Sequence, residues 1–269
     1  MAEVFAHHAH VFPDGANPQA TVERLAKLMD TCGVARAVCF APFAFQVPGM
    51  DPNAWLAETI ARRPRFRGFG TVDFARNDLA GQVRQIRELG LLGIKLHPNT
   101  QKFDILSPPA LEVYQAAQAE KLFLSFHTGV HHFRIKSYNV LGFDEIAHQF
   151  PDLRFSMEHV GGYHFFGDAL AVLFNNIPFP PKPGYLPRVH GGLVSVFNRT
   201  KLPFWYLTPQ QILDAIAQVG AELFIFGLDF PYNLEEDTRM GLEVIRSLPI
   251  SDEQKAMILG GNLRRELGL

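Results

Sequence analysis

The sequence places two histidines at a spacing suited to binding one metal ion. His8 and His10 belong to an apolar run near the N-terminus, residues 4–13. In an extended strand alternate side chains point to the same face, so we expect His8 and His10 to point together and His7 to face away. Neutral imidazole is a good ligand for zinc, iron, nickel or copper. The pair predicts a metal-binding position on the first strand, and a histidine-rich N-terminal arm is the alternative.

Other residues suited to chemistry follow later apolar runs. They are Lys95 and His97, His127, Glu158 and His159, and Asp229. In a barrel of parallel strands the carboxyl ends of all the strands meet at one face, where active sites form. We therefore expect these side chains to lie together, at the same rim as the first histidine pair.

The residue types indicate their roles. His8, His10, His127 and Asp229 form a predicted ligand set for one divalent ion, with zinc as our choice and manganese or iron as alternatives. Such an ion lowers the pKa of a bound water toward about 7. We interpret His159 as the general acid or base, and Asp229 as a residue that both contacts the metal and takes a proton.

Two further residues on the fourth predicted strand are candidates for substrate binding. Lys95 would pair with a substrate carboxylate, and His97 would lie beside it. A carboxylated Lys95 that bridges two metal ions is the alternative for this lysine.

Short apolar runs alternate along the chain with amphipathic stretches of helical length. The predicted strands are 4–8, 35–40, 66–72, 93–97, 122–127, 154–159, 192–197 and 223–227, and the predicted helices are 21–31, 52–62, 79–89, 109–120, 143–149, 168–175, 209–219, 234–247 and 251–259. Eight strand-then-helix units predict an α/β fold, a (β/α)8 TIM barrel in one domain over residues 1–269. A doubly wound open sheet is the alternative, although the glycine-rich nucleotide-binding motifs of such sheets are missing.

Local signals support several of these elements. Asp51, Ser107 and Thr208 each precede a proline and are predicted helix caps. Residues 175–187 contain five prolines and can be neither helix nor central strand. This segment is predicted either to wall a substrate pocket or to form a surface crossover.

Composition limits the functional class. Hydrophobic residues make up 47% of the 269 residues, charged residues make up 19%, and the net charge is −2. These values indicate a globular protein with a large core and argue against a nucleic-acid partner. The spacing of Cys32 and Cys39 fits no metal or redox motif, which favours two buried thiols. Without a signal-peptide pattern or a membrane-length apolar run, we expect a cytoplasmic protein with a small-molecule substrate, with a homodimer as the default assembly.

The chain resembles the amidohydrolase superfamily, in particular the amidohydrolase-related (amidohydrolase 2) branch of metal-dependent TIM-barrel hydrolases. That branch also includes decarboxylases of the aminocarboxymuconate-semialdehyde and resorcylate types. The landmarks that carry the resemblance are His8-Ala9-His10, residues 93–98 (GIKLHP), residues 126–129 (FHTG), residues 158–162 (EHVGG), residues 226–231 (FGLDFP) and residues 259–262 (LGGN).

The resemblance implies metal ligation by His8, His10, His127 and Asp229. It implies that His159 is a ligand in some members and a catalytic group in others. One departure concerns Ala6, because the family usually has an acidic residue two positions before the first histidine of the pair. Its loss would remove support from the ligands rather than a ligand. The seventh-strand segment, residues 192–198, also differs from the usual pattern.

Three functions fit these features. The first is a metal-dependent hydrolase acting on a small amide, ester or lactone through metal-activated water. The alternative is a metal-dependent non-oxidative decarboxylase of an aromatic or unsaturated acid. A barrel that binds ligands without catalysis is the third, suggested by Ala6. The same residues serve both enzymes, so the sequence does not choose between them.

Overall fold

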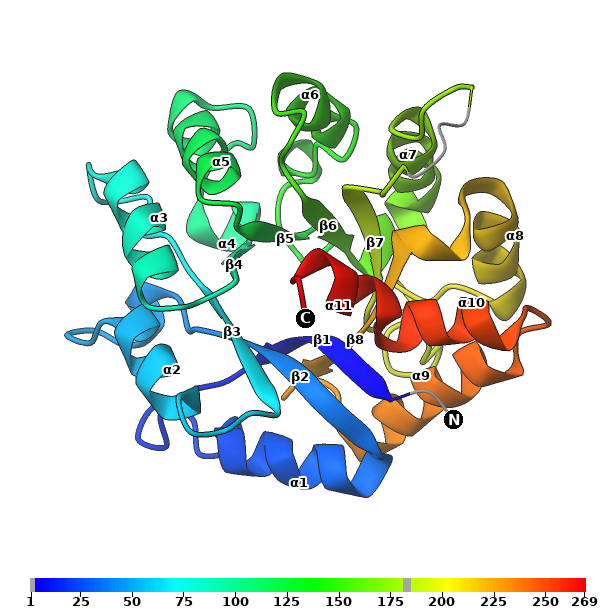
Figure 1. The fold of residues 1–269 in the computed structure, drawn as a ribbon, viewed down its shortest axis with the longest axis horizontal. Coiled ribbons are helices and arrows are strands. Elements are labelled where there is room, and N and C mark those ends of the chain that lie inside the picture. The colour runs from blue at the N-terminus through cyan, green and yellow to red at the C-terminus, as the bar shows by residue number, and fades with distance from the viewer. Residues whose placement is uncertain (1–2, 181–184) are drawn as a thin grey trace.

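Eight parallel strands close into a barrel (Figure 1). The computed structural model describes residues 3–180 and 185–269. The strands pair in sequence order from β1 to β8, and β8 pairs with β1 to close the ring. Helices follow the strands around the outside. The predicted TIM barrel is confirmed, and the open sheet is wrong.

The strands are short, and most begin near their predicted positions. They are β1 (Val4–His10), β2 (Val34–Phe40), β3 (Phe66–Gly70), β4 (Gly93–Leu96), β5 (Phe123–His127), β6 (Phe155–Glu158), β7 (Val189–Leu193) and β8 (Phe224–Phe230). The helices are α1 (Val22–Cys32), α2 (Pro52–Ile60), α3 (Leu79–Glu88), α4 (Pro98–Gln101), α5 (Pro108–Ala119), α6 (Gly142–Gln149), α7 (Gly162–Asn175), α8 (Pro209–Val219), α9 (Glu235–Ser247), α10 (Asp252–Ala256) and α11 (Asn262–Glu266).

Several predicted boundaries are wrong, and the largest errors concern β7 and α7. Strand β7 starts three residues before the predicted segment and ends at Leu193, because Ser195 takes up a left-handed backbone with φ of 57° and leads the chain out of the sheet. Helix α7 starts at Gly162, six residues earlier than predicted. Both errors lie where apolar residues continue past a strand end or precede a helix without a polar cap.

The predicted helix caps are partly confirmed. The Asp51 side chain accepts hydrogen bonds from the backbone N–H groups of Asn53 and Ala54, and the Thr208 hydroxyl accepts one from Gln211. Ser107 makes no such bond, because its hydroxyl donates instead to the Asp104 carbonyl, 2.6 Å away.

Hydrophobic side chains form two layers, one inside the barrel and one between strands and helices. The inner layer contains Phe5, Val38, Phe40, Phe69, Phe123, Ile225 and Leu263. The outer layer includes Val4, Ala6 and the free thiols Cys32 and Cys39. Along β1 the side chains therefore alternate outward, inward and outward from Val4 to Ala6, which defines the faces before the histidines begin.

The C-terminal segment closes the amino-terminal end of the barrel, where α11 lies in front of the strands in Figure 1. The Asn262 side chain donates to the carbonyl oxygens of Ala221 and Phe224. A Cβ at Gly260 would lie 2.7 Å from the backbone nitrogen of Phe5, so this position requires glycine. The last landmark of the resemblance therefore has a structural role.

The proline-rich segment lies away from the strand ends that carry the predicted site. Its described residues, 175–180 and 185–187, connect α7 to β7. The Tyr185 hydroxyl donates to the Asn176 carbonyl, and Phe179 is 97% exposed. None of these residues lines the pocket that contains His8, His127 and Asp229. The surface crossover is therefore the better interpretation, and residues 181–184 lie outside the described residues.

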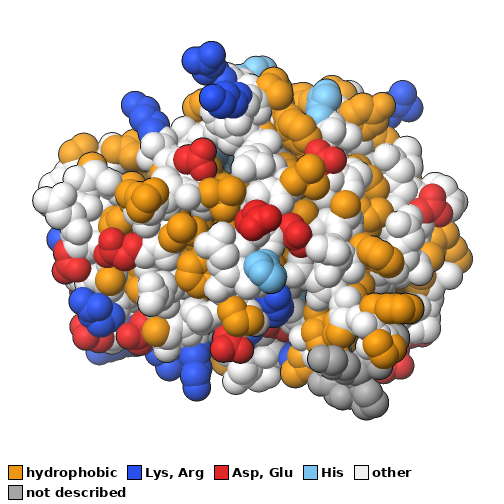
Figure 2. Space-filling view, turned by 90° about the horizontal axis from the view of Figure 1, so that it is seen from above, with side chains coloured by type: hydrophobic (Ala, Val, Ile, Leu, Met, Phe, Trp, Pro, Cys, Tyr) orange, Lys and Arg blue, Asp and Glu red, His pale blue; other side chains and the backbone are white. Residues whose placement is uncertain are grey.

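The outer surface mixes side-chain types. On the face drawn in Figure 2, hydrophobic, acidic and basic side chains are interspersed. Within residues 3–180 and 185–269, no helix combines the length and the apolar character that crossing a membrane requires.

Candidate metal centre and pocket

Three histidines of β1 point into the barrel, although two of them are neighbours in the sequence. His7 packs among inner-core phenylalanine rings, and its Nδ1 lies 3.2 Å from Oε1 of Glu158. His8 has a left-handed backbone with φ of 65°, and the pairing of β1 with β8 shifts register between His7 and Ala9. This bulge turns His8 and His10 inward as well. The prediction that His7 faces away is wrong.

A cluster of possible metal ligands forms where β1, β6 and β8 end. His8, His159 and Asp229 each offer one atom, and these three atoms lie within 4.8 Å of one another. Nε2 of His8 is 3.3 Å from Oδ1 of Asp229. Nε2 of His10 is 3.1 Å from Nε2 of His8 and 3.8 Å from the same carboxylate oxygen. His127 joins the cluster from β5, with its Nδ1 3.1 Å from Nε2 of His159.

Hydrogen bonds to oxygen acceptors fix the protons of three rings. Nδ1 of His8 lies 2.9 Å from Oε2 of Glu158, and Nδ1 of His159 lies 2.9 Å from a backbone carbonyl, that of Val194. Nε2 of His127 lies 2.7 Å from the carbonyl of Gly129. An ionised carboxylate or a carbonyl only accepts, so each of these nitrogens donates. The opposite nitrogen of each neutral ring therefore carries a lone pair.

The donor set fits a cation. Nδ1 of His127 and Nε2 of His159 face each other at 3.1 Å, and both carry lone pairs. Two facing lone pairs repel unless a positive charge lies between or beside them. Two nitrogens that each lie about 2.1 Å from one zinc ion are about 3.0–3.4 Å apart. The His8–His10, His8–Asp229 and His127–His159 distances of 3.1, 3.3 and 3.1 Å match that range, and the His10–Asp229 distance of 3.8 Å is longer.

Ser195 orients the Asp229 carboxylate. The Ser195 hydroxyl donates to Oδ2 of Asp229 over 2.5 Å. The Asn233 side chain donates in turn to the Ser195 oxygen and to the Leu228 carbonyl. With Oδ2 engaged, Oδ1 remains directed at His8. The unusual segment after β7 thus supplies a partner for Asp229.

The backbone at the site is unusual. His8, His159, Ser195 and Asp229 all have positive φ, at 65°, 66°, 57° and 59°. Residues other than glycine rarely adopt this conformation, and each instance costs about 1–2 kcal/mol. Strained backbone of this kind is typical of functional sites.

Glu158 supports His8 from across the barrel. Its side chain is fully buried, and Oε1 accepts a hydrogen bond from Ser156 while Oε2 accepts one from His8. Burial by itself raises the pKa of Glu158, but the nearby His7 and His8 hold that pKa well below its usual range. A buried carboxylate therefore fixes the first histidine of the pair, although Ala6 offers none.

Burial also sets the charge of the other groups. Burial lowers the pKa of His8, His10 and His127 well below its usual range. It lowers the pKa of His159 to about 3, with a further contribution from the nearby Lys95. These rings are neutral at pH 7, the form that binds metals. Burial raises the pKa of Asp229 to about 6, against the opposing effect of the Ser195 hydrogen bond.

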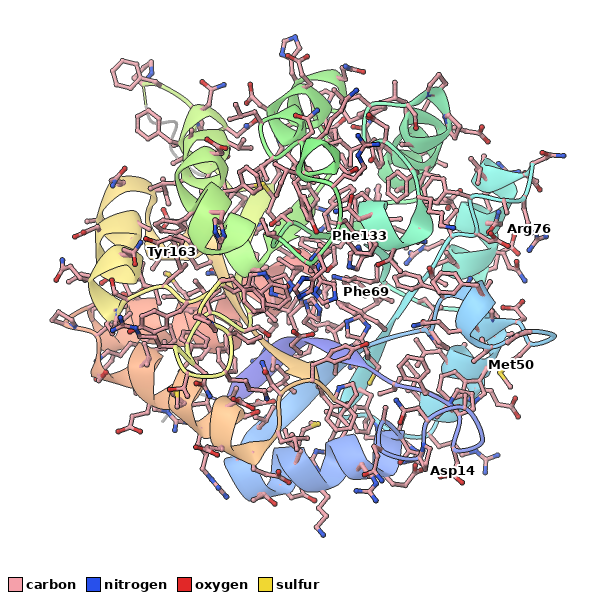
Figure 3. All side chains as sticks on the ribbon, turned by 180° about the vertical axis from the view of Figure 1, so that it is seen from behind. Asp14, Met50, Phe69, Arg76, Phe133 and Tyr163 are labelled. Atoms are coloured by element: carbon pink, nitrogen blue, oxygen red, sulfur yellow. The ribbon has the colours of Figure 1, made fainter. Side chains whose placement is uncertain are left out.

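All the residues predicted for the site line one pocket of about 280 Å³. They are His8, His10, Lys95, His97, His127, His159 and Asp229. Aromatic side chains form its walls, including Trp205, which stacks on His159 at a centroid distance of 4.2 Å. In Figure 3, which views the barrel from behind Figure 1, Phe133 of this wall lies near the centre and Met50 and Arg76 lie at the periphery.

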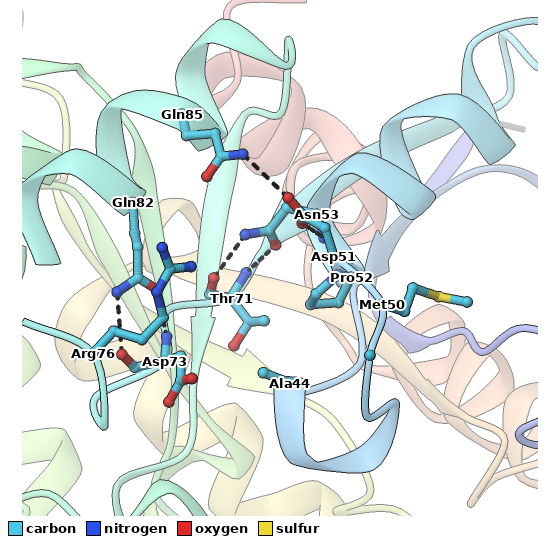
Figure 4. A pocket seen from close by; sticks show the side chains of 11 residues that line it. Ala44, Met50, Asp51, Pro52, Asn53, Thr71, Asp73, Arg76, Gln82 and Gln85 are labelled. Atoms are coloured by element: carbon cyan, nitrogen blue, oxygen red, sulfur yellow. Dashed lines mark hydrogen bonds between the residues drawn. The ribbon is translucent and has the colours of Figure 1, made fainter. Parts of the chain in front are cut away.

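A second hollow lies beside α2 and α3, and Figure 4 shows it. Several of its polar side chains pair with one another or with the local backbone, and Arg76 also lines it. The Asn53 amide exchanges two hydrogen bonds with the Thr71 backbone, and Gln82 does the same with Asp73. The Asn53 and Gln82 amides therefore form a structural network that joins the two helices to the loop after β3.

Sequence reasoning missed three residues of the central site. The sequence gives Glu158 a place in a landmark but no role, it predicts the wrong face for His7, and it marks the segment of Ser195 only as a departure from the family pattern. The acidic type of Glu158, directly before His159, was the one available signal.

Comparison with known proteins identifies the family. The family model described as amidohydrolase matches residues 7–269. The chain belongs to the amidohydrolase family. It falls in the amidohydrolase 2 branch, a group of enzymes that includes hydrolases and decarboxylases. A search of curated protein sequences finds no match.

Solved structures share the fold of this amidohydrolase. An uncharacterised TIM-barrel protein from Bordetella bronchiseptica is 17% identical, with a TM-score of 0.77 and 99% of this chain and 100% of that chain covered. A second similar structure is that of a dihydroxybenzoic acid decarboxylase from a Polaromonas species, with bound manganese and the inhibitor 2-nitroresorcinol. It is 16% identical, with a TM-score of 0.72, and the match covers 100% of this chain and 98% of that chain. A putative 2-pyrone-4,6-dicarboxylic acid hydrolase from Pseudomonas putida is 17% identical, with a TM-score of 0.69. The match covers 100% of this chain and 98% of that chain.

Proposed function

We propose that this amidohydrolase is a metal-dependent hydrolase of a small amide, ester or lactone. The observation that carries the proposal is the set of inward-facing lone pairs beside the Asp229 carboxylate, inside a pocket of about 280 Å³. A pocket of this volume suits one small ring or a short chain.

The ligand set in this proposal is larger than the sequence predicted. His8, His10, His127 and Asp229 keep their predicted roles, and His159 joins them because its Nε2 carries a lone pair toward the cluster. Imidazole and carboxylate ligands without a thiolate suit zinc, with manganese or iron as alternatives. When bound, such an ion polarises a carbonyl oxygen and makes water more acidic.

The protein's own groups then divide the remaining work. Asp229 is the proton acceptor, because its Oδ2 is held by Ser195 and its pKa of about 6 lies close to neutral pH. His159 is neutral and its Nε2 lone pair faces the cluster, so in this proposal it is a metal ligand rather than the predicted general acid or base. Lys95 and His97 bind the substrate away from the reacting carbonyl, and Trp205 excludes water from one wall.

A non-oxidative decarboxylase is the second candidate. The aromatic walls of the pocket favour it, and so does the Polaromonas relative, whose structure holds a flat aromatic inhibitor. A decarboxylase must protonate the substrate carbon. His159 is not available as that donor, because its Nδ1 is bonded to the Val194 carbonyl and its Nε2 lone pair faces the cluster, which is why hydrolysis is preferred.

Metal analysis and a substrate panel test the proposal. We expect about one divalent ion per chain, loss of activity with a chelator, and recovery with zinc or manganese. A panel of small lactones, esters and amides is compared with aromatic acids assayed for carbon dioxide release. His8→Ala and Asp229→Ala should abolish turnover, whereas His148→Ala, an exposed helix position, should not. Carbon dioxide release without hydrolysis would favour the second candidate, and turnover that survives both site variants would refute the site.

A further inference from the structure

An apolar groove, which we call the side groove, adjoins the pocket of the metal centre. It has a volume of about 590 Å³ and lies between the loops that follow β2 and β3 and the short helix α4. Phe43 and Thr100 line both the side groove and the pocket that contains His8, His127 and Asp229. Because the two hollows share these side chains, a molecule that fills the pocket can extend into the side groove.

Aromatic rings form much of the wall of the side groove. Phe45 is 59% exposed and stacks on Phe43 with ring centroids 5.7 Å apart. Phe74 faces the groove and stacks on Phe103, with centroids 4.0 Å apart. Exposed apolar surface of this kind marks binding sites, because covering it removes the surface from water.

Two glutamines fix the shape of the side groove. Oε1 of Gln46 accepts a hydrogen bond from the backbone N–H of Phe43 at 2.8 Å. Gln101 joins α4 to the loop after β3, because its Oε1 accepts from the N–H of His97 at 2.7 Å and its Nε2 donates to the Val72 carbonyl at 2.8 Å. The groove is therefore formed before anything binds, which lowers the entropy cost of binding.

The charges along the side groove are balanced. Among the described residues that line it, one is acidic, Asp73, and one is basic, Lys102. Oδ1 of Asp73 already accepts from the backbone N–H of Ala75 at 3.0 Å, and Lys102 is an exposed residue at the end of α4. Neither an anionic nor a cationic group gains a net electrostatic advantage here, so a neutral group fits best.

We propose that the side groove binds an uncharged alkyl arm of the substrate, attached to the group that reacts at the metal centre. This inference rests on the proposed function, because it names a part of the substrate of the same site. The side groove is larger than the pocket of about 280 Å³, so the arm holds several carbon atoms. Phe45, as the exposed wall of the groove, determines the preference for such an arm.

Alkyl hydroxamates test the side groove without any need for turnover, because they bind a metal ion through their oxygens and carry an arm of chosen length. Zinc-loaded protein is titrated calorimetrically with acetohydroxamate, butyrohydroxamate, hexanohydroxamate and octanohydroxamate. A methylene group that leaves water completely gains about fourfold in affinity, and we expect about twofold or more for each methylene added beyond butyrohydroxamate. Equal dissociation constants along the series, or no binding by any of the four, would overturn the proposal.

Three variants locate the arm. Phe45→Ala, which shortens an exposed wall, and Ala44→Asp, which adds a carboxylate to the groove, should each weaken octanohydroxamate about fivefold or more and leave acetohydroxamate within about twofold. Phe174→Ala, at a 63% exposed position of α7 that lines neither hollow, is the matched control and should change neither probe. An unchanged dependence on arm length in both groove variants, or equal losses in Phe45→Ala and Phe174→Ala, would overturn the assignment.

The two proposals fail in different ways. If no ester, amide or lactone is hydrolysed while the hydroxamates keep their dependence on arm length, the proposed function alone is refuted. If hydrolysis is observed and the hydroxamates bind equally whatever their length, the side groove alone is refuted.

Discussion

Nδ1 of His8 lies 2.9 Å from Oε2 of Glu158, a contact that joins β1 to β6 across the inside of the barrel. Both side chains are buried. The bond fixes the proton on Nδ1 and directs Nε2 toward Asp229. In metalloproteins a carboxylate in this position orients the imidazole ligand and increases its basicity. Glu158 therefore gives His8 its support, whereas the side chain of Ala6 faces outward, away from the ligands.

Replacing Glu158 tests that support. Glu158→Gln keeps the size of the side chain and removes its charge, so we expect zinc affinity to fall about 10- to 100-fold. Competition with a chromophoric chelator measures the dissociation constant. Glu58→Gln, at an exposed position of α2, is the control and should match the unmodified chain. A dissociation constant for Glu158→Gln within twofold of the unmodified chain would contradict the role.

Ser195→Ala should lower activity while the fold is kept. The lost hydrogen bond holds Oδ2 of Asp229, and a hydrogen bond to a charged group is worth about 1.5–3 kcal/mol. We expect kcat/KM on a hydrolysed substrate to fall about 10- to 100-fold. Ser247→Ala removes a hydroxyl that bonds the backbone of α9 and serves as the control. Equal activities in the two variants would show that Ser195 does not orient Asp229.

The left-handed backbone at His159 predicts an inverted order of stability between two small residues. His159→Gly should be about 1 kcal/mol more stable to urea than His159→Ala, because glycine adopts a positive φ without strain. At a regular helical position glycine is instead less stable than alanine. Ala116→Gly in α5 should therefore cost about 1 kcal/mol relative to the unmodified chain. Identical stabilities of the two His159 variants would mean that the strain is absent.

Acid should destabilise the metal-free protein between pH 7.5 and pH 5.5. Burial lowers the pKa of six histidines below the ordinary value of about 6.5. Five of them, His8, His10, His97, His127 and His159, are more buried than His131, which is exposed. Below pH 6.5 the unfolded chain binds protons that the folded chain does not, so stability falls as the pH is lowered. At pH 5.5 each of these five rings contributes about 1 kcal/mol to this loss.

Asp229 opposes that trend. Its folded pKa of about 6 lies above its ordinary value, so below pH 6 the folded chain binds a proton that the unfolded chain does not. The stability gained from the Asp229 carboxyl offsets about as much as one of the five histidines loses. Urea titrations of chelator-treated protein at pH 7.5 and pH 5.5 should therefore show a net loss of several kcal/mol. Equal stability at the two pH values would contradict the burial of these rings.

The barrel could be predicted because its signals are local and repeated. Each strand is a short apolar run followed by a helix with a recognisable start, such as Asp51 before Pro52. The parallel topology alone predicts that the histidines lie at the carboxyl end of the barrel. All seven predicted site residues line one pocket. The boundaries of β7 and α7 could not be predicted, because the chain turns at Ser195 and Gly162 without a change in hydropathy.

The side-chain directions and contacts inside the site could not be predicted from the sequence. Strict alternation from Phe5 turns His7 inward and His8 outward, and the positive φ at His8 is a property of the folded strand. The contacts of Glu158 with His8, and of Ser195 with Asp229, join residues 150 and 34 positions apart. Periodicity carries no information about such pairs.

The four non-glycine residues with positive φ at the site bear on how this protein can be engineered. A selection or design scheme that rewards thermal stability alone would favour glycine at positions 8, 159, 195 and 229. These substitutions would remove two imidazoles, a carboxylate and the hydroxyl that orients it. Any effort to make this barrel more heat-resistant must hold those four positions fixed, because there the most stable sequence and the working sequence diverge.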